Sequence, residues 1–288
     1  MGVPVRDQWH RRGVRHRVER PHRRARAGRV HDLRVRRRPR WRPSRGNCTG
    51  ARSPMSPHFD EPCLTEPATE VVARLKVAVP EALPIPELND PEAPSVTDSG
   101  NEPLVEVSHS RIAILGNYRR AGWRHAREGC WLRRPVAGRL ARVADRLPER
   151  WGLAVFDGWR PLDLQVELYE AALADPTVPP GLFAVPDAEP SRPPPHLTGC
   201  AVDLTLTLDG VALAPGTGFD DLTLLARADA LEDLPGPDRD VRRLLYWSMR
   251  AAGFVVFDAE WWHFEYGTRR WGAITGNQPR FGPTAPPD

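Results

Sequence analysis

The chain has 288 residues, a formal net charge of +4 and 40% hydrophobic residues, which fits a globular protein able to bury a sizeable core. The apolar runs are too short for a transmembrane helix and the amino terminus lacks the apolar core of a secretory signal, so we expect a cytoplasmic protein with no membrane partner. The four cysteines, Cys48, Cys63, Cys130 and Cys200, show no paired metal-ligand spacing. Free thiols are the simplest interpretation, although spacing alone leaves a disulfide open.

The first 54 residues concentrate positive charge. Residues 1–54 hold 18 arginines against three acids, a net charge of +15, which leaves −11 for the remainder. Clustered arginines can neutralise nucleic-acid phosphates. However, Lys76 is the single lysine of the chain, which indicates a coding bias toward arginine, and the basic segment stops just before Met55. We therefore predict a disordered tail, with the hypothesis that it lies upstream of the true start at Met55; a nucleic-acid-binding arm is the less favoured alternative.

Two segments of the chain are rich in proline. Residues 55–103 are acidic and rich in proline, which predicts a linker or surface wrap, with one helix expected around residues 68–79. A second proline-rich stretch over residues 175–195 predicts a long loop.

From residue 104 onwards the hydrophobic spacing alternates between helical and extended. In chain order we expect a helix over 134–147, a strand over 152–158, a helix over 161–175, strands over 200–208 and 211–214, a helix over 239–252, and strands over 254–257 and 260–266. Asp209-Gly210 is a strong hairpin signal, Asp238 is expected to cap the third helix, and Pro161 is expected in the first turn of the second.

These elements predict an α+β fold. A small, mainly antiparallel sheet flanked by helices would form a single catalytic domain over residues 104–271, followed by a polar tail over residues 272–288.

An aspartate lies inside the apolar strand that begins after Gly199. A buried carboxylate costs several kcal/mol unless a positive partner meets it. Strand alternation places Cys200, Val202 and Leu204 on one face and Asp203 on the other, so Asp203 should point away from the apolar face. Cys200 is accordingly interpreted as a packed thiol.

His196, Asp203 and His263 suggest a metal site. Two histidines and one carboxylate are a common ligand set for catalytic zinc, with the fourth position left to water, and Glu260 could take a proton from that water. Because positions i and i+3 of a regular strand face opposite ways, Glu260 and His263 share a site only if their strand begins with a bend or bulge. Spacing alone leaves open that the histidines are hydrogen-bonded core residues and that Asp203 is a structural acceptor.

Three motifs, in order, resemble one known family. FDGWRP at 156–161, HLTGCAVDLTL at 196–206 and EWWHFEY at 260–266 are similar to the signature segments of the zinc D-alanyl-D-alanine dipeptidases of the vancomycin-resistance type, within the wider D,D-peptidase clan. The similarity covers roughly residues 104–271. It implies one zinc ion per chain, held by His196, Asp203 and His263.

The resemblance also implies the roles of the other site residues. Glu260 would be the general base, Arg160 would stabilise the oxyanion, and Asp220 in the segment GTGFDD would bind the free amino group of a dipeptide. Without the resemblance, Arg160 could be a surface ion pair and Asp220 a helix cap.

The implied activity is zinc-dependent hydrolysis of a short D-amino-acid dipeptide, D-Ala-D-Ala above all, by a metal-activated water. Pro194 and Pro195 stand where the family has serines, so the polar contacts that those serines make with substrate are missing or moved in this chain, because proline has neither a hydroxyl nor a backbone N–H donor. The alternatives are a D,D-carboxypeptidase or endopeptidase acting on cell-wall peptides, and a metal-containing binding module without catalysis, against which Glu260 argues. The only partner expected is the small dipeptide; the oligomeric state stays open.

Overall fold

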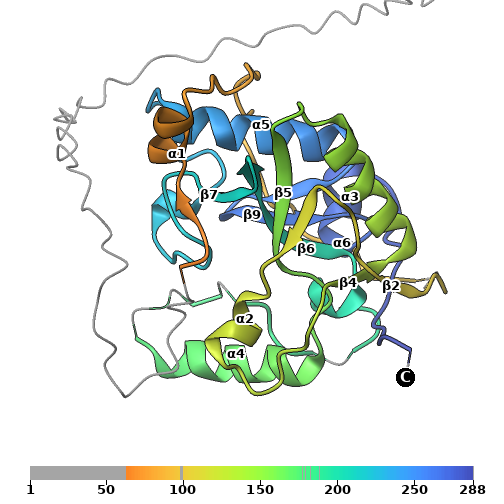
Figure 1. The fold of residues 1–288 in the computed structure, drawn as a ribbon. Coiled ribbons are helices and arrows are strands. Elements are labelled where there is room, and N and C mark those ends of the chain that lie inside the picture. Colours follow the sequence, from red (N-terminus) through yellow and green to blue (C-terminus); the bar gives the residue numbers. More distant parts are fainter. Residues whose placement is uncertain are drawn as a thin grey trace, which may run out of the picture. The chain divides into compact units, whose positions relative to one another are not determined.

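The strand that carries Asp203 is an inner strand of a mixed sheet (Figure 1). One edge of β6 pairs antiparallel with β5, while the other edge pairs antiparallel with β9 at its start and with β7 at its end. The bounds are β5 Trp151–Asp157, β6 Ala201–Leu208, β7 Val211–Ala214 and β9 Glu260–Glu265. Every residue of β6 is buried, so both faces of this strand are covered.

Shorter strands extend the sheet. Two lie parallel to their neighbours, β1 beside β7 and β3 beside β5, and β8 pairs antiparallel with β9. A separate antiparallel pair joins β2 to β4. The bounds are β1 Glu66–Pro67, β2 Leu104–Glu106, β3 Ile112–Ile114, β4 Trp131–Arg133 and β8 Val255–Phe257.

This computed structural model describes residues 63–97, 100–176, 178, 180, 181, 183–187 and 189–287. The tail predicted over residues 1–54 and the start at Met55 lie outside the described residues. Within the described part of the chain, no helix is both long and apolar enough to cross a membrane.

The helices follow the hydrophobic spacing of the sequence. In α3, the positions that fall on one face, Val136, Leu140 and Val143, are buried, and Pro135 sits in the first turn, where a missing N–H costs nothing. Helices α3 and α5 contact each other, and both contact the sheet. The bounds are α1 Ala68–Leu75, α2 Asn117–Ala121, α3 Arg134–Arg146, α4 Leu162–Ala174, α5 Pro237–Ala251 and α6 Arg269–Thr275. The predicted α+β class is confirmed.

The expected hairpin is also present. Asp209 and Gly210 have φ of 50° and 81°, so both central residues of the turn between β6 and β7 are left-handed, as a two-residue type I′ turn requires. Two finer predictions are wrong. Helix α5 begins at Pro237 after Gly236, so Asp238 lies in its first turn, where its carboxylate accepts the Thr69 N–H at 3.2 Å. Pro161 precedes α4 as its N-cap.

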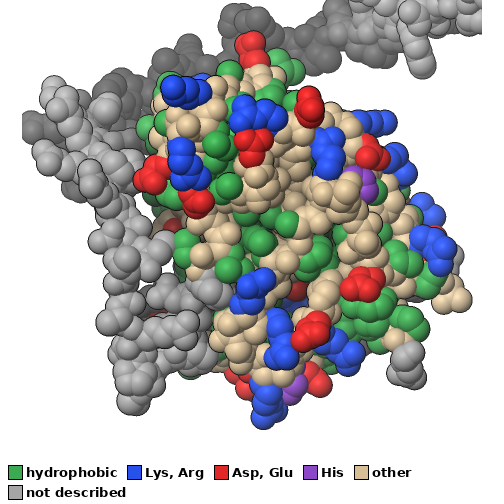
Figure 2. All heavy atoms as spheres, viewed as in Figure 1, with side chains coloured by type: hydrophobic (Ala, Val, Ile, Leu, Met, Phe, Trp, Pro, Cys, Tyr) green, Lys and Arg blue, Asp and Glu red, His purple; other side chains and the backbone are tan. Residues whose placement is uncertain are grey.

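The chain on either side of the expected domain also packs onto it. Residues 77–97, which we call the strap, contain no helix or strand, yet Ile85 and Val96 within them are buried. The stretch expected as a polar tail begins inside α6, and Phe281 beyond it is 1% exposed. Among the described residues on the face seen in Figure 2, acidic and basic side chains are interspersed and form no block of one sign.

Candidate active site

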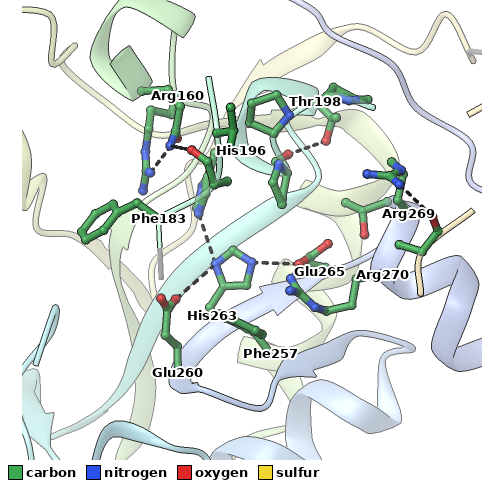
Figure 3. Close-up of a pocket in the computed structure, with 18 of the residues that line it drawn as sticks. Arg160, Phe183, His196, Thr198, Phe257, Glu260, His263, Glu265, Arg269 and Arg270 are labelled. Carbon is green, nitrogen blue, oxygen red and sulfur yellow. Dashed lines mark hydrogen bonds and ion pairs between the residues drawn. The ribbon is translucent and has the colours of Figure 1, made fainter. Parts of the chain in front are cut away.

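A cavity of about 660 Å³ lies beside the start of β6 (Figure 3). Its walls come from strands β6, β8 and β9, helices α2, α4 and α6, several loops between the elements, and residues 90–93 of the strap. All six residues singled out from the sequence line it: Arg160, His196, Asp203, Asp220, Glu260 and His263.

The register of two strands brings Asp203 and His263 together. They are directly paired residues of β6 and β9, so their side chains leave the sheet on the same face. Asp203 Oδ1 lies 2.9 Å from His263 Nδ1.

His196 reaches the same point from a tight turn. It begins the 3₁₀ turn His196–Thr198, which Gly199 ends with a φ of 69° before β6 starts. A side chain at Gly199 would be strained by that φ, and its Cβ would also lie 2.3 Å from a Leu104 methyl carbon. His196 Nε2 lies 3.3 Å from Asp203 Oδ2 and 3.2 Å from His263 Nδ1.

These three side chains could hold a metal ion. One nitrogen or oxygen from each lies within 4.8 Å of the others, and the residues are between 2% and 6% exposed. The far nitrogen of each ring already has a partner: His196 Nδ1 lies 2.7 Å from the Gly158 carbonyl, and His263 Nε2 lies 3.0 Å from Glu265 Oε1. Each imidazole therefore directs its remaining nitrogen at Asp203, an arrangement typical of metal-binding histidines.

The charges of this cluster shift its pKa values strongly. Burial alone would raise the pKa of Asp203, but His196 and His263 hold it well below its usual range. Burial alone would lower the pKa of His263, yet its hydrogen bonds with Asp203 and Glu265 raise it to about 10. The carboxylates of Asp203 and Glu265 on either side of His263 therefore favour its protonated form.

Glu260 lies at a strand irregularity of the kind the spacing required. Phe257 of β8 pairs with Glu260, whereas Val256, one residue earlier, pairs with Phe264, so the β9 strand bulges between them. The bulge places Glu260 Oε2 3.8 Å from His263 Nδ1. Burial, reinforced by the charge of Asp203, raises the pKa of Glu260 to about 6. A carboxyl group with this pKa can both accept and release a proton near neutral pH.

Arg160 is fixed on the other side of Asp203. Its guanidinium donates to Asp157 Oδ2 at 2.8 Å and to Gln165 Oε1 at 2.9 Å, and lies 3.6 Å from Asp203 Oδ2. With 6% exposure, Arg160 is not the surface ion pair that the sequence had left open.

Tyr118 links Arg160 to Asp220. The tyrosine hydroxyl accepts from Arg160 Nη2 at 3.3 Å and donates to Asp220 Oδ2 at 3.0 Å. Asp220 has a φ of 55°, which is costly for a residue other than glycine and is often found at functional sites. The cap of the nearby 3₁₀ turn is Thr223, so the helix-cap alternative for Asp220 is wrong.

Other cavity residues were not anticipated. Glu265 follows His263 by two positions on β9, so strand alternation was a usable signal for it. Tyr118 and Gln165 come from separate helices, and nothing in the sequence links them to the motifs. Thr198, next to Pro194 and Pro195 in the cavity wall, uses its hydroxyl within its own turn, donating to the Pro195 carbonyl at 2.6 Å.

The chemistry of this cavity is that of a metal-dependent hydrolase: a buried two-histidine, one-carboxylate cluster lies next to a carboxyl group that titrates near neutrality. Comparison with known proteins narrows the class. A family model described as D-Ala-D-Ala dipeptidase matches residues 130–276. A D-alanyl-D-alanine dipeptidase of Synechocystis sp. (strain ATCC 27184 / PCC 6803 / Kazusa) is 29% identical over 221 residues, covering 66% of this chain and 87% of that protein. The chain belongs to the D-Ala-D-Ala dipeptidase family, whose members are metallopeptidases.

Proposed function

We propose that this chain is a zinc-dependent dipeptidase that hydrolyses a short D-amino-acid dipeptide, with D-Ala-D-Ala as the first candidate. The observation that carries the proposal is the convergence of His196, Asp203 and His263, in a chain that belongs to this family. Zinc would be held by His196 Nε2, His263 Nδ1 and a carboxylate oxygen of Asp203. When bound there, zinc supplies a Lewis acid that polarises the peptide carbonyl and lowers the pKa of water.

Glu260 would transfer the proton. A carboxylate oxygen of Glu260 accepts a proton from the attacking water and then delivers it to the nitrogen of the leaving amine. The pKa of about 6 supports this role, since such a group is mostly ionised at neutral pH yet returns the proton readily. The presence of this base also argues against a binding module without catalysis.

Arg160 would stabilise the negative charge that develops on the carbonyl oxygen. Its hydrogen bonds to Asp157 and Gln165 hold the guanidinium in place before substrate arrives. Because a donor fixed in advance needs no reorganisation during the reaction, it contributes fully in the transition state.

Asp220 would bind the free amino group of the dipeptide. It lines the same cavity and is oriented by the Tyr118 hydroxyl, and an ammonium group would meet a carboxylate there. A substrate whose amino end is blocked would lose this ion pair, so Asp220 favours free dipeptides over longer peptides.

The test combines metal analysis with hydrolysis of D-Ala-D-Ala and of N-acetyl-D-Ala-D-Ala. We expect one zinc ion per chain and a clear preference for the free dipeptide. Preference for the blocked peptide would favour the D,D-carboxypeptidase or endopeptidase alternative and reject the role of Asp220. Bound zinc without hydrolysis of either compound would favour the non-catalytic alternative. An Asp220→Asn variant is the matched control, because it should weaken use of the free dipeptide and leave the blocked one unchanged.

A further inference from the structure

Behind His263 lies a buried carboxylate that the proposed reaction does not use. Glu265 is 0% exposed, and its Oε1 accepts hydrogen bonds from His263 Nε2 at 3.0 Å and from Arg270 Nη1 (Figure 3). Glu265 is therefore a buried carboxylate whose Oε1 is held by both His263 and Arg270.

Arg270 connects this carboxylate to the strap. Its Nε and Nη2 donate to the two carboxylate oxygens of Asp90, at 2.8 Å and 3.1 Å, in a two-point ion pair. The guanidinium also lies 3.9 Å from the centre of the Phe257 ring, which limits its freedom to move. Arg270 thus bridges two acids: Glu265, which is fully buried, and Asp90, which is partly exposed to solvent.

The neighbouring arginine holds the same part of the strap. Arg269 donates to the carbonyls of Ala93 and Pro94, at 2.7 Å and 2.8 Å. Both arginines lie in the first turn of α6, whose start is fixed by the Thr268 side chain accepting the Trp271 N–H. Strap residues 90–93 also form part of the cavity wall. The contacts of Arg269 and Arg270 with the strap therefore hold part of the cavity wall in place, and Arg270 also holds the carboxylate of Glu265.

We propose that Glu265 is a positioning residue for His263, and that Asp90 of the strap holds Glu265 in place through Arg270, so that attachment of the strap is coupled to retention of the metal. The inference rests on the proposed zinc site. The physical reason is that a carboxylate accepting the Nε2 proton fixes the ring orientation and leaves Nδ1 available as the ligand atom. Loss of Asp90 would release one side of Arg270 and so loosen the support of Glu265.

The experiment measures how fast zinc is lost to an excess of chelator from the full, zinc-loaded chain. Glu265→Gln keeps the shape of the side chain but removes its charge, and we expect zinc loss to become about 10- to 100-fold faster. Asp90→Asn acts one residue further away, and we expect a smaller acceleration, about three-fold or more. Arg270→Lys should resemble Asp90→Asn, because lysine cannot bridge both acids with the same planar geometry.

The matched control is Glu232→Gln, which breaks the Glu232–Arg243 ion pair. That pair has side-chain exposures of 20% and 15% and does not line the described cavity, so zinc loss should stay within about two-fold of wild type. The double variant Asp90→Asn, Glu265→Gln should lose zinc about as fast as Glu265→Gln alone, since Asp90 acts through Glu265.

The outcomes separate the two proposals. If the wild type retains zinc and hydrolyses the dipeptide while Glu265→Gln and Asp90→Asn lose zinc at the wild-type rate, the inference is overturned and the proposed function stands. Strictly additive effects in the double variant overturn the relay through Arg270. If Glu265→Gln does not fold, Asp90→Asn and Arg270→Lys decide alone, and wild-type rates in both overturn the inference. A wild-type protein that retains no zinc overturns both proposals.

Discussion

Replacing Glu260 by glutamine separates proton transfer from metal binding. Glu260→Gln keeps the size of the side chain and leaves His196, Asp203 and His263 unchanged. Loss of a general base typically costs about 10²- to 10⁴-fold in rate, which corresponds to about 3 to 5 kcal/mol of transition-state stabilisation. We expect kcat for D-Ala-D-Ala to fall by that factor, while the zinc content stays at the wild-type level.

The same substitution should stabilise the metal-free protein, and the sign follows from the pKa. Burial raises the pKa of Glu260 from 4.5 to about 6, so ionising this side chain is harder in the folded than in the unfolded chain. Above pH 6 the difference amounts to about 2 kcal/mol against the folded state, and glutamine removes it. Below pH 4.5 the residue is protonated in both states, and the gain should vanish.

Two measurements check this reasoning. Steady-state hydrolysis with parallel metal analysis gives the catalytic effect, and denaturant unfolding of the metal-free proteins across this pH range gives the stability difference. A variant that keeps more than about a tenth of the wild-type kcat would refute Glu260 as the base. A stability difference that does not grow between pH 4.5 and 6 would refute the burial argument.

Three further predictions concern His263, Arg160 and Arg242. The pKa of His263 is raised to about 10, so zinc binding must release a proton from this side chain. The zinc affinity of the metal-free protein should therefore increase as the pH rises toward that value. Calorimetry in buffers of different ionisation enthalpy would give the number of protons released. Arg160→Lys should lower kcat about 10²- to 10³-fold with zinc retained, as measured by kinetics and metal analysis, because lysine cannot keep both the Asp157 and Gln165 contacts. Arg242 is buried and donates to two carbonyls on either side of Asp220 in the sequence, Pro215 at 2.8 Å and Arg227 at 2.7 Å. Arg242→Met leaves both carbonyls without this donor, so it should destabilise the chain by about 3 kcal/mol and raise KM, as measured by unfolding and kinetic assays.

The local patterns of this sequence were sufficient for most elements and for the apolar face of β6. The alternation of side chains along the strand placed Asp203 on one face and Val202 and Leu204 on the other, and in the structure Val202 and Leu204 belong to the hydrophobic core. The Asp209-Gly210 turn was readable because few residue pairs adopt two left-handed conformations in succession. Such features depend on near neighbours in sequence, which is why they could be predicted.

Contacts between segments that are distant in the sequence could not be predicted from it. The Asp90–Arg270 pair joins residues from opposite ends of the described chain, and nothing in either local sequence specifies the other. Tyr118 enters the cavity only because the short helix α2 packs beside β5. The bulge at the start of β9 could be stated as a requirement, but its occurrence depends on pairing with β8, which the spacing of Glu260 and His263 does not encode.

The inner position of β6 has a consequence for the protein when metal is scarce. Two of the three side chains that could hold the ion, Asp203 and His263, sit on strands bonded to each other inside the sheet, and β5 covers the far edge of β6. The backbone pairing that holds these strands does not involve the ion, so their amide protons should exchange only when the entire sheet opens, with or without metal. Loss of the ion therefore need not unfold the chain. We expect the metal-free chain to stay folded but inactive, and to regain activity when the metal is added again.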